Sequence, residues 1–256
     1  AVAPTANPVK VINLSLGGGS WDCGLFADVA AQGVSVVAAA GNNGDESPGT
    51  LNYPASCSNV ISVAATTSVD ERAVYSQFNS LVDIAAPGGS YDDNDANGTV
   101  DLVPAYGNNT TLQGMQGTSM ASPHVSGAIA LMYAVDPNMS PTTVNSYLQN
   151  GYLTDDIGQS GKDNSFGYGR LNLAKTIENT LDNIGDTSST YFYSDPMYVD
   201  YGDSTTQYSI SLRKVGDGSL SVTSLTAADG TGLSYTRIVD TNGAGSYTCL
   251  LYTSDA

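Results

Sequence analysis

The chain has 256 residues, 41% of them hydrophobic and 13% charged, so it is long enough for one large or two modest domains with a sizeable core. Its 25 acidic and 8 basic residues give a net charge of −17, which argues against partners such as nucleic acid or an anionic membrane. This balance fits a secreted protein that is adapted to salt or carries calcium, although solubility alone also explains it.

Three cysteines are too few for a disulfide scaffold, but they allow one bridge. We pair Cys23 with Cys57, because both flank the same predicted sheet, and a bridge there indicates an oxidising compartment. No stretch has the length of a membrane span, and residues 1–20 lack the features of a signal peptide. Without an initiator methionine, and with a buried strand expected from Val9, the chain is predicted to begin in mid-domain.

The first two thirds of the chain alternate predicted strands and helices. A strand, a helix and a strand follow one another within about thirty residues, which predicts a parallel βαβ unit. In its helix, Leu25, Phe26, Val29 and Ala30 are expected to face inward. The predicted strands are 9–16, 34–40, 60–65 and 81–86, and the predicted helices are 21–32, 118–134, 140–149 and 173–181.

After Asn183 the pattern changes to alternating segments, such as 208–212 and 220–223, separated by Gly-Asp turns. This pattern is typical of a β-sandwich, but only about 65 residues are present where an immunoglobulin-like sandwich has about 100. We therefore expect an α/β domain at 1–182, a truncated immunoglobulin-like all-β extension at 183–248, and a non-native tail at 249–256 that contains Cys249.

The run GTSMASPHVSG, residues 117–127, carries the strongest chemical signal. The apolar residues after it predict a helix that starts near Thr118, with its free N–H groups and positive dipole end at Ser119. An oxyanion formed at such a serine would be stabilised, but serine and threonine also commonly serve as plain helix caps. This motif alone leaves both interpretations open.

Two further motifs agree with a nucleophilic serine: VINLSLGG at 11–18 and VVAAAGN at 36–42. Together with GTSMA at 117–121, Tyr53-Pro54, APG at 86–88 and GYGRLN at 167–172, they resemble the C-terminal two-thirds of a subtilisin-family serine protease catalytic domain, roughly over 9–182. The resemblance implies a three-layer fold with a mainly parallel sheet. It also implies a secreted endopeptidase that cleaves extended polypeptide through an acyl-enzyme, with apolar or medium side chains in its pocket.

The resemblance further implies roles for single residues. Ser119 is similar to the family's nucleophile, and its backbone N–H is similar to one of the two oxyanion donors. The Asn42 side chain is similar to the other donor. Asn42 also suits a turn. The pocket for the side chain before the scissile bond has one wall at residues 39–41, and its opposite wall includes residues 51–54, where Asn52 makes the floor more polar. The substrate-binding residues implied by the family are Ser15, Leu16 and Gly17 along the substrate strand and Ala39, Ala40 and Gly41 in the pocket wall.

A catalytic base is not evident. In the family, an aspartate and a histidine base precede the Ser15 segment. The chain's single histidine, His124, lies on the helix of Ser119 and is predicted to point away from it, so we interpret it as a buried structural residue. No aspartate can be assigned as its partner. We therefore expect a missing N-terminal third rather than a degenerate relative, and an inactive fragment.

An acidic run matches the first half of a calcium loop. Asp93, Asp95 and Asn97 alternate before Gly98, and Asp101 stands where a ninth-position ligand would fall. The closing glutamate is absent, so a structural calcium and a solvated acidic loop both remain open. Hydrolysis itself needs no cofactor.

The sequence thus favours a monomeric endopeptidase, secreted, periplasmic or associated with the cell surface, that acts on polypeptide without nucleic-acid or membrane partners. One alternative is a pseudo-protease or peptide-binding module that holds an extended chain at 15–17 without cutting it. Another is an adhesive or substrate-anchoring β protein.

Overall fold

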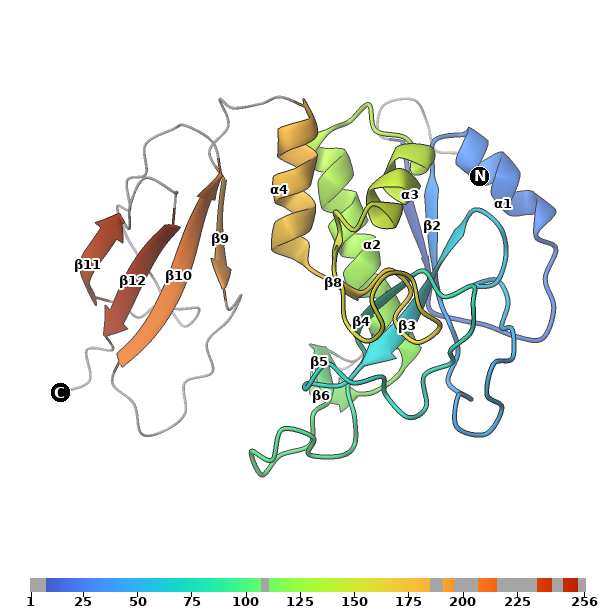
Figure 1. The fold of residues 1–256 in the computed structure, drawn as a ribbon, viewed down its shortest axis with the longest axis horizontal. Helices are drawn as coiled ribbons and strands as arrows, with labels where there is room; N and C mark the ends of the chain where they lie inside the picture. Colours follow the sequence, from blue (N-terminus) through green and yellow to red (C-terminus); the bar gives the residue numbers. More distant parts are fainter. Residues whose placement is uncertain are drawn as a thin grey trace. The chain divides into compact units, whose positions relative to one another are not determined.

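The computed structural model describes residues 8–106 and 111–184, and after them the backbone of four strands: β9 (Tyr191–Asp195), β10 (Gln207–Val215), β11 (Ser234–Asp240) and β12 (Ser246–Tyr252). The chain divides into two compact units, Ala1–Thr180 and Leu181–Ala256 (Figure 1). The division falls inside the helix α4 (Leu173–Ile184). Each unit is described by itself.

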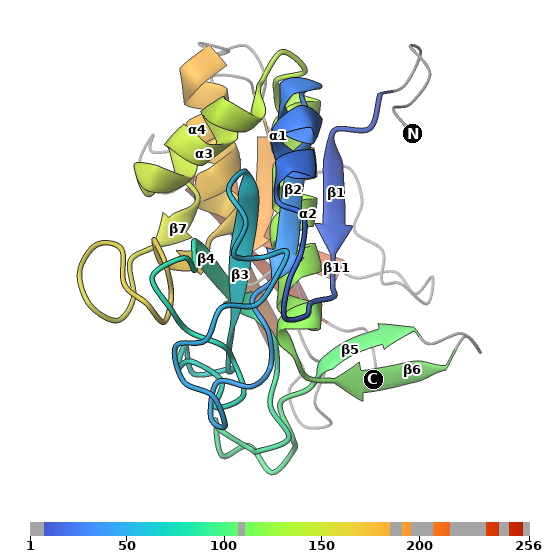
Figure 2. The ribbon, with the colours of Figure 1, turned by 90° about the vertical axis from the view of Figure 1, so that its right-hand side faces the viewer.

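A six-stranded sheet forms the centre of the first unit, in the order β1-β2-β3-β4-β8-β7. Figure 2 shows β1 at one edge of this sheet. All neighbouring pairs are parallel except β7 and β8, so the predicted mainly parallel α/β class is confirmed. Every side chain of the two interior strands β2 and β3 is buried, as expected of a parallel sheet covered on both faces. The bounds are β1 (Val11–Leu14), β2 (Ser35–Ala39), β3 (Val60–Thr66), β4 (Ile84–Pro87), β7 (Thr154–Asp155) and β8 (Arg170–Leu171).

Helices pack on both faces of this sheet. In β2, Val37 packs with the helix α2 (Thr118–Val135), whereas Val36 and Ala38 pack with Phe26 of α1 (Gly24–Ala31). Because successive side chains of a strand point to opposite faces, α1 and α2 lie on opposite sides of the sheet and the unit has three layers.

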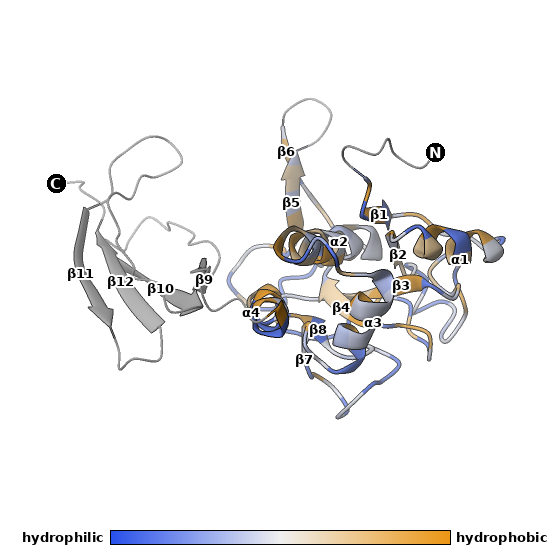
Figure 3. Ribbon diagram, turned by 90° about the horizontal axis from the view of Figure 1, so that it is seen from above, coloured by the Kyte–Doolittle hydropathy of each residue, from blue (hydrophilic) through white to orange (hydrophobic). Residues whose placement is uncertain are grey.

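The remaining helices complete the unit. The helix α3 (Pro141–Gln149) begins as predicted, with the Ser140 hydroxyl accepting the Thr143 N–H at 3.1 Å and a proline in the first turn. The helix α4 is amphipathic, with a hydrophobic and a hydrophilic side (Figure 3). A separate hairpin, β5 (Val103–Tyr106) and β6 (Leu112–Met115), leads into α2.

Several predicted element ends are wrong. Val9 and Leu16, expected in a buried first strand, are each 47% exposed, because in the described sheet β1 is an edge strand that makes only four residue pairs with β2. Leu25 is 54% exposed, and only Phe26 in α1 is buried. Fewer residues of this helix are therefore buried than predicted. Leu81, expected at the start of a strand, lies in the turn before β4.

The described strands of the second unit form one antiparallel sheet in the order β11-β12-β10-β9. The predicted segment 208–212 lies in β10, whereas 220–223 lies outside the described residues. An immunoglobulin-like sandwich and a non-native tail from Cys249 remain predictions; Cys249 itself lies in β12 opposite Ile210. Within the described part of the chain, no helix has the length and apolar character to cross a membrane.

Candidate active site

Ser119 lies in the first turn of α2, two residues after Gly117, which precedes the helix. Gly117 has a φ of +147°, a conformation that favours glycine. A Cβ atom placed on Gly117 would lie 3.4 Å from Asn42 Nδ2 and 3.6 Å from Ser119 N. The Ser119 N–H has no hydrogen-bond partner among the described residues, as is usual in a first helical turn. Two N–H donors therefore flank a single space, which the missing side chain leaves open.

The Asn42 amide is oriented by Thr118. Asn42 Oδ1 accepts the backbone N–H of Thr118 at 2.9 Å and its hydroxyl at 2.8 Å. The same hydroxyl accepts the Gly41 N–H at 3.1 Å, and Thr118 is fully buried. Because the amide oxygen is held by two donors, the NH₂ group of Asn42 is the part left to face the space at Gly117. Thr118 is therefore a positioning residue that the sequence motif did not single out.

A proline in α2 ties the helix to the sheet. Pro123 has no N–H, so the carbonyl oxygen of Ser119, four residues earlier, lacks its helical donor. The Ser15 hydroxyl, just after β1, donates to this oxygen at 2.8 Å. In return, the Ser119 hydroxyl donates to the Ser15 carbonyl at 3.4 Å. The candidate nucleophile and the segment predicted to hold substrate are thus directly linked.

A polar network extends this link along α2. Asn13 Nδ2 donates to Ser15 Oγ at 2.9 Å. Asn13 Oδ1 accepts the hydroxyls of Ser122 at 2.7 Å and Ser126 at 3.0 Å. Of these residues only Ser15 was predicted as functional; Asn13, Ser122 and Ser126 were not. The available signal was an asparagine two residues before a serine at the end of a strand, which is too common to identify a site.

A cavity of about 460 Å³ opens beside Ser119. Leu16, Gly17, Ala39 and Gly41 line it, and so do Leu51 and Asn52. Ala40 does not: it is 2% exposed and packs in the core with Ala64, because its side chain points to the face opposite that of its neighbours. Ser15 is also absent from the lining, since its side chain is directed to α2.

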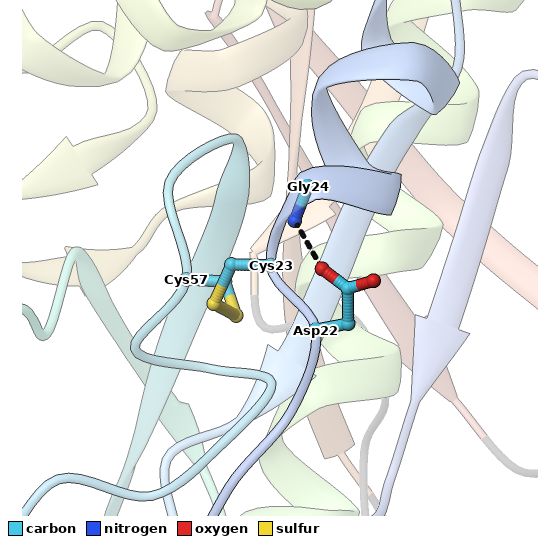
Figure 4. The surroundings of a disulfide bond; sticks show 4 residues. All are labelled: Asp22, Cys23, Gly24 and Cys57. Atoms are coloured by element: carbon cyan, nitrogen blue, oxygen red, sulfur yellow. Dashed lines mark hydrogen bonds between the residues drawn. A yellow bond between two sulfur atoms is a disulfide. The ribbon is translucent and has the colours of Figure 1, made fainter.

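Two connections join the cavity walls. Gly18 and Tyr53 exchange backbone hydrogen bonds of 2.8 and 2.9 Å, forming a short antiparallel bridge. Further out, Cys23 and Cys57 form the predicted disulfide, with Cα atoms 5.3 Å apart (Figure 4). The Asp22 carboxylate beside it accepts the Gly24 N–H at the start of α1.

His124 does not serve as a base in this structure. It is exposed rather than buried, because it lies outside the buried stripe of α2 that contains Ala121 and Val125, and its Nδ1 is 2.8 Å from the Met120 carbonyl oxygen. Within residues 8–106 and 111–184, the single hydrogen bond of the Ser119 hydroxyl is the one to Ser15. The described residues therefore place two N–H groups beside the space at Gly117 and no base against Ser119.

Tyr75 supports the residue before this helix. Its hydroxyl donates to the Gly89 carbonyl at 2.8 Å and accepts the Gly117 N–H at 3.1 Å. Burial raises the pKa of Tyr75 to about 12, while the bond from Gly117 acts in the opposite direction. The hydroxyl thus joins the turn after β4 to the start of α2.

The raised pKa predicts a loss of stability at alkaline pH. The folded chain holds the Tyr75 proton more tightly than the unfolded chain, where the pKa is about 10. This contribution is fully present below pH of about 10 and is lost as the pH rises towards 12. Unfolding in denaturant at several pH values should show a shallower alkaline decline for Tyr75→Phe than for the wild type. Tyr91→Phe, at an exposed tyrosine, should retain the wild-type slope; equal slopes in all three proteins would contradict the assignment.

The acidic loop brings three of its four predicted ligands together. Carboxylate oxygens of Asp93, Asp95 and Asp101 lie within 4.8 Å of one another. The fourth, Asn97, is bonded within the loop, where its Oδ1 accepts the N–H and hydroxyl of Thr99 at 2.9 and 2.6 Å. The hydrogen bond from the Ser68 hydroxyl lowers the pKa of Asp101, desolvation acts in the opposite direction, and the Asn94 N–H lowers it further.

Comparisons with known proteins agree on one family. The family model described as "Subtilase family" matches residues 1–169. An "Extracellular protease" of Xanthomonas campestris pv. campestris is 40% identical over 161 residues, which are 58% of this chain and 25% of that protein. "Subtilisin DY" of Bacillus licheniformis is 40% identical over 148 residues, 56% of this chain and 50% of that protein.

A solved protease of Pseudoalteromonas arctica matches with a TM-score of 0.57 and 32% identity, covering 69% of this chain and 52% of that one. The chain thus spans between a quarter and about half of the length of these relatives.

Proposed function

The chain belongs to the subtilase family, and on this premise we propose that it forms part of the catalytic domain of a serine endopeptidase with Ser119 as nucleophile. Ser119 Oγ would attack the carbonyl carbon of the scissile peptide bond while a base removes its proton. The oxyanion would be held by the Ser119 N–H and Asn42 Nδ2. The proton then passes to the leaving amine, and water releases the acyl group from Ser119. The convergence of these two donors on the space at Gly117 carries the proposal.

The proposed substrate is an extended polypeptide. Its backbone would lie along Leu16 and Gly17, with the side chain before the scissile bond in the cavity between Ala39, Gly41 and Asn52. The link from Ser15 to Ser119 supports this arrangement, because it fixes the substrate-holding segment relative to the nucleophile.

Turnover requires a base within hydrogen-bond distance of Ser119 Oγ. His124 is engaged with the Met120 carbonyl, so we propose that another group performs this role in the active protein. The 256-residue chain by itself is accordingly expected to be inactive or nearly so, with only the residual effect of oxyanion donors and binding. We also propose that the protein is secreted and monomeric, in line with the extracellular relative and with the Cys23–Cys57 disulfide.

Covalent labelling tests the proposal directly. A fluorophosphonate probe applied to the whole gene product should modify Ser119, as located by mass spectrometry of the tryptic peptides. Ser119→Ala should lose the label, and Ser58→Ala, at an exposed serine on the loop after Cys57, should keep it. A folded protein that binds peptide without being labelled would instead be the peptide-binding module.

We also propose that the loop that contains Asp93, Asp95 and Asp101 binds calcium. Their three carboxylates suit a hard cation, and Asn94 Oδ1 is a buried oxygen with no hydrogen-bond partner among the described residues. Each carboxylate oxygen has two lone pairs, so the hydrogen bonds within the loop leave room for a metal ligand. A bound calcium ion would cross-link the loop and would take no part in hydrolysis.

Removal of calcium is then expected to lower the thermal midpoint by roughly 5–10 °C, the effect of a ligand present at about 100 times its Kd. The measurement is thermal unfolding with and without EDTA. Asp93→Asn with Asp95→Asn should abolish the difference, and Asp28→Asn with Glu46→Gln, which removes the same charge from exposed sites, should preserve it. If EDTA leaves the wild-type midpoint unchanged, the loop is simply solvated.

A further inference from the structure

The cavity beside Ser119 has a polar floor without a charged group. Its walls at Gly17, Ala39 and Gly41 carry small or no side chains, and no lysine, arginine, aspartate or glutamate lines it in the described part of the chain. Its polar lining includes the side chains of Asn52 and Gln77. Uncharged carboxamide groups therefore contribute to the chemistry of this cavity.

Asn52 lies between the two glycines of the cavity walls. A Cβ atom on Gly17 would overlap Asn52 Nδ2, and one on Gly41 would lie only 3.0 Å from the same nitrogen. The amide of Asn52 therefore occupies the slot between the two wall segments, and it limits how deep a side chain can enter. A side chain at Gly17 or Gly41 would therefore require the Asn52 amide to move.

The main chain of Asn52 is fixed by hydrogen bonds, whereas its side-chain amide is not. Its main chain is fixed, because Asn52 O accepts the Ser56 N–H at 2.9 Å and Tyr53 pairs with Gly18. The carboxamide itself makes no hydrogen bond to any residue that the structure describes, although Asn52 is only partly exposed. It has an acceptor and two donors available for a ligand.

Gln77 adds a second acceptor. It is 2% exposed, and its Nε2 donates to Ser47 O at 2.9 Å and Thr50 O at 2.8 Å. These bonds fix the side chain and leave Oε1 without a donor among the described residues. A partly enclosed site with unpaired polar groups binds a ligand that pairs them and discriminates against an isostere that cannot.

We propose that Asn52 is a specificity-determining residue that selects an uncharged amide side chain, above all glutamine, at the position before the scissile bond. The glutamine amide would pair with the Asn52 carboxamide and donate towards Gln77, and the Asn52 side chain would stop longer residues. This rests on the proposed function, because it takes the cavity beside Ser119 as the site of that side chain. It departs from the apolar preference implied by the family resemblance.

The test uses the whole gene product and two peptide substrates that differ only in glutamine or methionine before the cleaved bond. These side chains have nearly equal size, so their kcat/KM ratio reports hydrogen bonding. We expect about a tenfold preference for glutamine in the wild type, the discrimination typical of one such interaction, and its loss in Asn52→Leu. The matched control is Asn145→Leu, at a half-buried asparagine of α3 outside the cavity, which should keep the wild-type ratio.

Asn52→Asp keeps the shape of the side chain and serves if the leucine variant does not fold. It should shift the preference from glutamine towards lysine by about tenfold, because a carboxylate would then face the entering side chain. Equal ratios in wild type and both Asn52 variants, with hydrolysis retained, would overturn the specificity proposal alone. Absence of both hydrolysis and fluorophosphonate labelling would overturn the proposed function, and the specificity proposal with it.

Discussion

Replacing Ser119 with alanine is expected to lower kcat of the whole gene product by about 10⁶-fold, the scale of loss that follows removal of the serine nucleophile from a subtilisin. Without Oγ no acyl-enzyme can form, so only the oxyanion donors and substrate binding remain to accelerate attack by water. The measurement is kcat and KM on a peptide substrate, with KM expected to stay close to the wild-type value.

Folding should be nearly unaffected by this change, because the Ser119 hydroxyl makes a single, long hydrogen bond of 3.4 Å among the described residues. Thermal unfolding of Ser119→Ala therefore serves as the internal control, and Ser58→Ala as the matched substitution with normal activity. More than about 1% residual activity in Ser119→Ala would mean that another group is the nucleophile.

Asn42→Ala is expected to lower kcat by about 10²–10³-fold, as does removal of one oxyanion donor from a subtilisin. The amide NH₂ faces the space at Gly117, where negative charge would develop only as the carbonyl is attacked. An interaction made only in the transition state changes kcat and leaves KM little altered. Steady-state kinetics separate the two constants. Asn145→Ala is the matched control outside the site.

Thr118→Val extends this prediction to the residue that orients Asn42. Valine lacks the hydroxyl that donates to Asn42 Oδ1 and accepts the Gly41 N–H, but it leaves the backbone N–H bond to Asn42 in place. A loss of kcat of about tenfold, smaller than that of Asn42→Ala, is expected from one lost positioning bond. A raised KM with unchanged kcat in Asn42→Ala would make Asn42 a binding residue instead.

Sequence patterns were sufficient to predict the parts of the fold that bury their side chains. The runs at β2 and β3 are apolar throughout because both sheet faces are covered, and α3 carries its own capping serine and proline. The ends of β1 and the exposure of Leu25 could not be predicted, because both depend on which neighbours cover those residues. Local patterns contain no information about such contacts.

The same limit applies to the site. Motif resemblance pointed to Ser119, Asn42 and most of the residues that line the cavity, because these residues stand within short, recognisable motifs. The exposure of His124 depends on which elements cover its face of α2, and the Tyr75 hydroxyl pairs with Gly117 across 42 positions of the chain. Such pairs leave no periodic trace in a single sequence.

The proline in α2 has a consequence for motion. The ends of isolated helices fray, because their first turns lack the hydrogen bonds that hold the interior. At Ser119 the donor that Pro123 cannot supply comes from Ser15, at the end of the sheet. Opening of the first turn of α2 therefore also requires the hydrogen bonds between Ser15 and Ser119 to break, so the end of the strand helps to hold the serine in position.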